Sequence, residues 1–168
     1  IARVLRRERP ETRIILAEPA NAALLGSGIP QERRADGAPS ASHPAFEPHP
    51  IQGWTPDFIP LVLQEAIDQK YYDELIPVTG PEGIKWAREL AQREGIFTGI
   101  SGGSTFAVAR RAAEAAPPGS VVLAMLPDTG ERYMTTPLFE GIAEDMDEAE
   151  VAISLSTPGF QMPSAPRT

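Results

Sequence analysis

The sequence predicts an α/β fold built around a mostly parallel β-sheet. Short apolar runs that suit buried strands alternate with segments whose apolar residues recur at helical spacing. Within these runs apolar residues follow one another instead of alternating with polar residues, as expected for strands that are covered on both faces. The 168 residues correspond to one domain, and a hydrophobic content of 42% is sufficient for a packed core.

Three apolar runs carry the strand predictions. Residues 14–17 form the first, which ends at Glu18 and Pro19, and residues 74–78 form the second. Residues 120–126 are the most continuous and the richest in valine, so they are expected to form a central strand. A further short extended segment is predicted over residues 96–100.

Helices are predicted between these strands. Pro81 suits the first helical position, with Thr79 or Gly80 as the N-cap, and Gly95 suits the end of the same helix. Ser101 is expected to cap the next helix, which the pair Pro117-Pro118 ends. The predicted helices cover residues 1–9, 61–71, 80–94, 101–116 and, as a short helix, 138–142.

Two parts of the chain lack a regular pattern. Residues 20–57 are rich in proline and turn residues and are expected to form a long loop, of which residues 20–50 should be mobile and pack few apolar side chains. Residues 144–168 are acidic and then contain serine, threonine and proline, so a loose or surface-hugging tail is expected. The predicted domain therefore spans residues 1–143.

Composition excludes several classes of function. A formal net charge of -8 disfavours nucleic acid and anionic membranes as partners. The absence of cysteine excludes disulfides, thiolate metal sites and a cysteine nucleophile. Because we find neither a membrane-spanning run nor a signal peptide, we expect a soluble, cytoplasmic protein.

Residues 99–103 read Gly-Ile-Ser-Gly-Gly and match the nucleophile motif of α/β hydrolases. That mechanism needs a histidine after the serine in the chain, but His43 and His49 both precede Ser101. The hydrolase interpretation is therefore disfavoured. Two alternatives stay open: Ser101 caps a helix, or its hydroxyl and the first backbone N–H groups bind a ligand.

The remaining polar and aromatic candidates are less specific. His43 and His49 lie six residues apart without a clear carboxylate partner, so solvated loop histidines are expected and no metal site is predicted. Trp54 and Phe58 flank Pro56 and could form either an aromatic wall or core.

Four strings follow one another along residues 1–143. In order and spacing they resemble the cysteine synthase (O-acetylserine sulfhydrylase) family of fold-type II pyridoxal-phosphate enzymes. The resemblance implies the parallel-sheet domain of a tryptophan synthase beta-like enzyme, incomplete because only the C-terminal portion is covered. The strings are Ile14 to Pro19, Ile51-Gln52-Gly53 through Phe58-Ile59-Pro60, Glu94-Gly95-Ile96 through Gly103, and Leu126-Pro127-Asp128-Thr129-Gly130-Glu131-Arg132-Tyr133.

The resemblance implies roles for four positions. Ser101 would hydrogen-bond the pyridine nitrogen of pyridoxal phosphate, and Pro127 and Asp128 would border that side of the ring. Gly53 would contact the substrate amino acid through its backbone. The sequence departs from the family pattern at residues 54–57, where Trp-Thr-Pro-Asp replaces a small Gly-Ala-Gly-like run and reshapes the substrate end.

The family's Schiff-base lysine and its phosphate-binding loop have no counterpart here. Only Lys70 and Lys85 occur, both expected on helix surfaces, so no catalytic residue is predicted in this chain. The chain is expected to be an inactive fragment of a cysteine-forming β-replacement enzyme that uses O-acetylserine and sulfide.

The resemblance further implies a homodimer and a possible complex with serine acetyltransferase. The alternative is a non-catalytic, truncated α/β remnant that binds a ligand or a partner.

Overall fold

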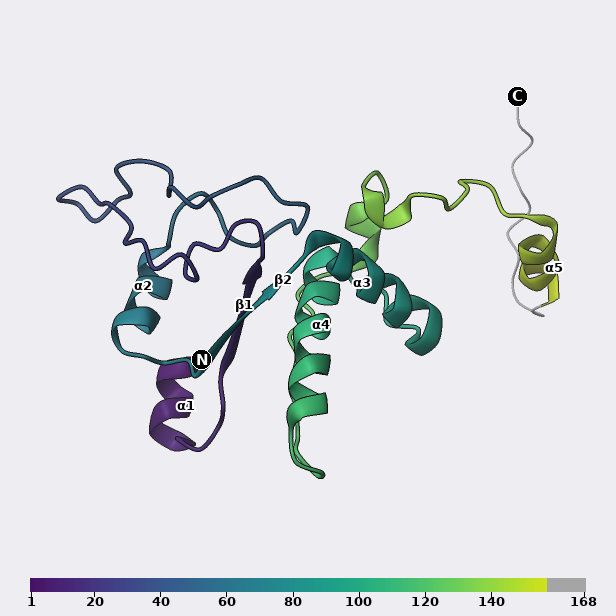
Figure 1. Cartoon of the computed structure of the whole chain (residues 1–168). Helices are drawn as coiled ribbons and strands as arrows, with labels where there is room; N and C mark the ends of the chain where they lie inside the picture. The colour runs from purple at the N-terminus through teal and green to yellow at the C-terminus, as the bar shows by residue number, and fades with distance from the viewer. Residues whose placement is uncertain (157–168) are drawn as a thin grey trace. The chain divides into compact units, whose positions relative to one another are not determined.

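The structure is a computed structural model that describes residues 1–156. It divides into two compact units, the first covering Ile1–Leu138 and the second beginning at Phe139. The regular elements, drawn in Figure 1, are α1 (Ala2–Glu8), β1 (Ile15–Pro19), α2 (Leu61–Asp68), β2 (Glu74–Val78), α3 (Gly80–Glu94), α4 (Ile100–Ala115), the 3-10 helices η1 (Gly130–Tyr133) and η2 (Pro137–Phe139), and α5 (Glu148–Ser156).

The sheet consists of β1 and β2, which pair in parallel as predicted. Ile15 lies opposite Glu74, and Pro19 lies opposite Val78. The pairing continues past the strands, because the Ala20 amide donates to the Val78 carbonyl at 2.9 Å. The α/β class and the parallel arrangement are therefore confirmed, and both strands end where the long segment and α3 begin.

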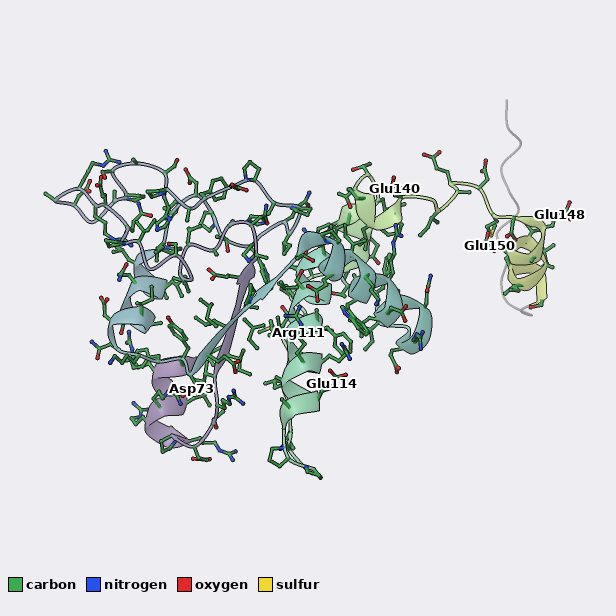
Figure 2. The ribbon with its side chains drawn as sticks, in the orientation of Figure 1. Asp73, Arg111, Glu114, Glu140, Glu148 and Glu150 are labelled. Carbon is green, nitrogen blue, oxygen red and sulfur yellow. The ribbon has the colours of Figure 1, made fainter. Side chains whose placement is uncertain are left out.

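An ion pair ties α1 to the start of β2. Asp73, labelled in Figure 2, accepts from Arg6 Nη2 at 2.6 Å and from the Ile14 amide at 2.6 Å. The carboxylate thus joins α1, the residue before β1 and the residue before β2. The Arg6 hydrogen bond lowers the pKa of Asp73 from its usual value.

Helix α3 begins and ends as the sequence predicts. Thr79 is its N-cap and forms a capping box with Glu82, in which each side chain accepts from the other residue's amide. Gly95 ends the helix in the left-handed conformation with φ 67°. An L-residue adopts that conformation with difficulty, which explains a glycine at this position.

Glycines let the N-terminal turns of α3 and α4 approach closely. A Cβ on Gly103 would lie 2.1 Å from the Gly83 carbonyl, and a Cβ on Gly83 would lie 2.2 Å from Ser104 Oγ. Arg111, labelled on α4 in Figure 2, adds an ion pair with Glu82 and a 2.9 Å hydrogen bond to the Pro77 carbonyl. These contacts hold α4 against the start of α3 and against the end of β2.

The long segment over residues 20–57 is irregular, as predicted, but it packs more apolar side chains than expected. Ala22, Leu24 and Ile51 are buried. Ala22 and Leu24 form a small core with Ile59, against which other side chains pack: Leu25, Phe46, Leu63 and Ile67. The prediction of few packed apolar groups is therefore wrong, because apolar residues without periodicity can still meet in a folded loop.

The predicted central strand over residues 120–126 is not a strand in the structure. Val121 and Leu123 are 95% and 96% exposed. A strand requires a neighbour for its hydrogen bonds, and among the described residues β1 and β2 pair with each other. The composition of this segment suits a buried strand, but in the described structure it pairs with neither β1 nor β2.

The predictions for residues 138–142 and for the tail differ from the structure in detail. The expected helix over residues 138–142 is replaced by η2, and α5 lies within the predicted tail. The rest of that tail, residues 157–168, lies outside the described residues. No helix of residues 1–156 is long and apolar enough to cross a membrane.

Candidate functional site

Ser101 lies in the first turn of α4 but does not cap it. The N-cap is Gly99, no side chain caps this helix, and Ser101 is its second residue. The capping interpretation of Ser101 is therefore wrong. Ser101 is nevertheless 2% exposed, and its hydroxyl acts to lower the pKa of Tyr133.

The segment before α4 holds the loop that contains Asp128. Thr98 and Thr129 form an isolated antiparallel bridge, and Thr98 Oγ1 donates to the Asp128 carbonyl at 3.2 Å. The Gly130 amide donates to the Phe97 carbonyl at 3.2 Å. The extended segment predicted over residues 96–100 thus contributes a bridge that places this loop beside the start of α4.

Tyr133 is hydrogen-bonded to Asp128 in the neighbourhood of Ser101. The buried Tyr133 hydroxyl donates to Asp128 Oδ2. Burial, followed by the neighbouring Asp128 carboxylate, raises the pKa of Tyr133 above its usual value, while the Ser101 hydroxyl acts in the opposite direction. No polar role is predicted for Tyr133 from the sequence, so this contact with Asp128 was not expected.

The second Asp128 oxygen has no partner among the described residues. Asp128 Oδ1 is buried and accepts no hydrogen bond there. It faces the N-cap of α4, because a Cβ on Gly99 would lie 2.6 Å from it. The structure therefore brings Ser101 and Asp128 together, with the exposed Pro127 immediately before Asp128.

Gly53 lies in a separate turn that is anchored near α3. Its φ of 83° is in the left-handed region, and the nearby Thr55 has a φ of 37°. His49 Nε2 contacts the Thr55 carbonyl at 3.2 Å. The preceding Pro50 packs on the start of α3, where a Cβ on Gly80 would lie 2.1 Å from it. This geometry explains a glycine at position 53 without a ligand.

A largely apolar cavity of about 280 Å³ lies between β1 and this turn. Trp54, Thr55, Pro56 and Phe58 line it, so the two aromatic residues form a cavity wall. Neither Ser101 nor Asp128 lines this cavity.

Glu18 contributes the cavity's charged group. Its carboxylate accepts from the Leu25 amide at 3.0 Å and from the Gly26 amide at 2.9 Å. Burial raises the pKa of Glu18, although these two hydrogen bonds act against that shift.

His43 is buried, whereas the sequence predicts a solvated histidine at this position. It is 2% exposed, Nε2 contacts the Ile29 carbonyl at 2.9 Å, and Nδ1 accepts from the Ala45 amide at 3.1 Å. It is thus a buried histidine that serves the internal hydrogen bonding of the loop. No group of three or more metal-ligating side chains occurs within residues 1–156.

Both lysines lie on the surface. Lys85 is on α3, with its Nζ 5.2 Å from the Trp86 ring centroid. Lys70 follows α2 in the left-handed conformation with φ 52°, rather than on the helix as expected. Neither side chain therefore belongs to the group formed by Ser101, Asp128 and Tyr133.

Comparison with known proteins identifies the family to which the chain belongs. The family model for "Pyridoxal-phosphate dependent enzyme" matches residues 1–128. The chain belongs to this family. Pyridoxal phosphate is its cofactor, and the predicted resemblance to fold-type II enzymes is confirmed.

Two curated relatives have different activities. The chain is 43% identical to O-ureido-L-serine synthase of Streptomyces lavendulae over 157 residues, which cover 94% of this chain and 42% of that protein. It is 32% identical to a cysteine synthase of Staphylococcus aureus over 139 residues, which cover 83% of this chain and 38% of that protein. The chain thus spans about two-fifths of the length of these relatives.

Solved structures agree on the fold. A crystal structure of O-ureido-L-serine synthase superposes with a TM-score of 0.71 at 43% identity, covering 90% of this chain and 42% of that one. A cysteine synthase from Entamoeba histolytica gives 0.65 at 27% identity, covering 92% and 40%. The parallel β1–β2 pair and the helices therefore belong to the fold of these enzymes.

Proposed function

We propose that this chain supplies one side of the active site of a pyridoxal-phosphate-dependent β-replacement enzyme. The observation that carries the proposal is the group of Ser101, Asp128 and Tyr133 at the start of α4, in a family whose cofactor has a polar ring nitrogen. A buried carboxylate oxygen without a partner supports a polar ligand at this place. The enzyme domain covers residues 1–143 in this proposal.

Four residues of the chain face the proposed ligands. Ser101 contacts the ring nitrogen, Pro127 and Asp128 border that side of the ring, and Gly53 contacts the substrate amino acid through its backbone. When bound, the cofactor supplies an electron sink for chemistry at the amino acid. The protein's contribution here is to set the polarity around the ring through a hydroxyl rather than a direct carboxylate contact.

The substrate in this proposal is a β-substituted L-alanine. O-acetylserine with sulfide would give cysteine and acetate, as the cysteine synthase relatives suggest. The higher identity to O-ureido-L-serine synthase supports a nucleophile larger than sulfide. Trp54, Thr55 and Pro56, which line the apolar cavity, would select between these nucleophiles.

The reaction also needs a lysine that this chain does not place in the site. We propose that a lysine-bearing half completes the active site, that the complete enzyme is a cytoplasmic homodimer, and that it binds serine acetyltransferase. Lys70 and Lys85 are exposed, which supports a catalytic lysine outside these residues.

The experiment compares the 168-residue chain with a joined protein. In the joined protein, the part of the Streptomyces lavendulae relative that this chain does not match precedes Ile1. Each is given pyridoxal phosphate and O-acetylserine, with sulfide or hydroxyurea as nucleophile, and product is measured against free cofactor. We expect product from the joined protein only.

Each outcome bears on the proposal. Product from the chain alone would overturn the need for a second half. Cofactor binding without product from the joined protein would favour the alternative, a non-catalytic ligand-binding remnant. A Ser101→Asp variant of the joined protein is expected to bind cofactor but lose β-replacement, because a carboxylate holds the ring nitrogen protonated.

A further inference from the structure

Glu18 is a buried carboxylate in the wall of the apolar cavity beside β1. It is 4% exposed, and it is the one ionisable residue among those that line the cavity. No salt bridge pairs it with a cation within residues 1–156. Buried charges in proteins are normally paired, so the ionised carboxylate lacks the counter-ion that its burial calls for.

Two backbone amides fix the carboxylate without neutralising it. The Leu25 amide donates to Oε2 at 3.0 Å, and the Gly26 amide donates to Oε1 at 2.9 Å. A Cβ on Gly26 would lie 2.6 Å from Oε1, so the glycine permits this close contact. A carboxylate offers about four lone-pair positions, and two of them are used here. The carboxylate therefore keeps acceptor capacity for a further donor.

Aromatic rings line the same cavity. Trp54 and Phe58 belong to its wall, and most of the other lining side chains are aliphatic. The face of an aromatic ring attracts a cation, and tryptophan does so most strongly. A carboxylate together with aromatic rings suits an ammonium group, while the aliphatic side chains suit a hydrocarbon body.

The backbone of the aromatic wall is strained. Thr55, which also lines the cavity, has a φ of 37°, and this is unusual for a β-branched residue. His49 Nε2 donates to the Thr55 carbonyl at 3.2 Å and so helps to hold this conformation. Such strain persists where the surrounding structure imposes it, commonly at binding sites.

We propose that this cavity binds an organic cation, a protonated primary amine on a compact apolar body, with Glu18 as its counter-ion and Trp54 and Phe58 in its wall. The volume of about 280 Å³ exceeds the ~150 Å³ of a cavity that holds benzene, so a single ring with an aminomethyl group fits. The inference goes beyond the proposed function, because it requires neither the cofactor nor Ser101.

The test uses two probes of the same shape and different charge. Protonated 4-fluorobenzylamine and neutral 4-fluorobenzyl alcohol are each titrated with the 168-residue chain near neutral pH, and ¹⁹F NMR gives the bound fraction. We expect the ammonium to bind at least about tenfold more tightly than the alcohol, since a charge-assisted hydrogen bond replaces a neutral one. Equal affinities, or tighter binding of the alcohol, would overturn the proposal.

Variants identify the counter-ion. Glu18→Gln keeps the shape of the side chain and is expected to weaken ammonium binding at least about tenfold, while alcohol binding changes by less than about twofold. Glu32→Gln is the matched control, because it removes an exposed carboxylate of the same long segment and should affect neither probe. An equal loss for both probes in Glu18→Gln would indicate an altered cavity and would contradict the counter-ion role.

A measurement on the native chain avoids the risk that a variant fails to fold. An alkylammonium stays charged between about pH 4 and pH 8, whereas Glu18 ionises in this range because burial raises its pKa above 4.5. Ammonium affinity should therefore rise with pH, and alcohol affinity should not. An ammonium affinity that is constant over this range would overturn the proposal.

The same titration is repeated with the joined protein. Retained ammonium binding would support a site that belongs to the complete enzyme. Binding that occurs in the 168-residue chain and disappears in the joined protein would show that the second half fills the cavity, and it would overturn the proposal. Product formation has no part in these measurements, so a joined protein without β-replacement activity would contradict the proposed function and leave this inference standing.

Discussion

Gly99 and Tyr133 are in such close contact that a Cβ on the glycine would lie 2.2 Å from Tyr133 Cε2. The φ of Gly99 is -74°, so its backbone would accept any L-residue, and the requirement for glycine is steric. The contact joins the start of α4 to the residue whose hydroxyl donates to Asp128. It therefore couples the packing of the site to its hydrogen bonds.

Gly99→Ala is expected to destabilise the chain by about 1–3 kcal/mol, because Tyr133 and Asp128 must move to admit a methyl group. Urea denaturation measures the free energy of unfolding. In a Tyr133→Leu background the same substitution should cost less, since the clashing ring edge is gone. Equal costs in the two backgrounds would show that the ring does not impose the glycine.

Glu18 should make stability depend on pH. Burial raises its pKa above the ordinary value of 4.5, so its contribution to stability is full below 4.5 and is lost as the pH rises through the raised pKa. We expect the unfolding free energy of the native chain, relative to that of Glu18→Gln, to fall over this interval. Chemical denaturation at a series of pH values measures the difference.

Glu32→Gln is the control for this measurement, because it removes an exposed carboxylate from the same long segment. The difference in unfolding free energy between Glu32→Gln and the native chain should stay constant over the same pH interval. A Glu18→Gln difference that rises with pH would show that the two amide hydrogen bonds, rather than burial, dominate the ionisation of Glu18.

Thr79→Ala should lower the unfolding free energy by about 1 kcal/mol, since it removes the acceptor for the Glu82 amide, 3.3 Å away. Thr79→Ser keeps a hydroxyl at the same place and should retain most of the stability. Thermal or urea unfolding compares the two. If serine and alanine cost the same, the threonine methyl group, and not the cap, accounts for the loss.

Local rules explain which parts of the fold were predictable. Thr79, Pro81 and Gly95 carry short-range signals, and the bounds of α3 followed from them closely. The site required contacts between distant residues: nothing in the sequence indicates that Thr98 holds the Asp128 backbone 30 residues further on, beside the start of α4. The burial of His43 was missed for a similar reason, because its partner Ile29 is 14 residues away and becomes a neighbour only when the loop folds.

The segment over residues 120–126 shows the limit of composition as a guide. Its valines and leucines favour a strand, but a strand forms there only if another strand lies beside it. In the described structure Val121, Leu123 and Met125 are exposed instead. An exposed apolar segment with unpaired backbone groups is a template for pairing with another chain.

We therefore expect the 168-residue chain to self-associate through this segment. Leu123→Lys should reduce the association measured by sedimentation velocity and change the unfolding free energy by no more than about 0.5 kcal/mol, because the side chain is 96% exposed. Val62→Lys is the matched control: it adds the same charge at an 83% exposed apolar position on α2, away from this segment. An equal reduction by both variants would indicate a general effect of charge, whereas a reduction by Leu123→Lys alone would place the contact at residues 120–126.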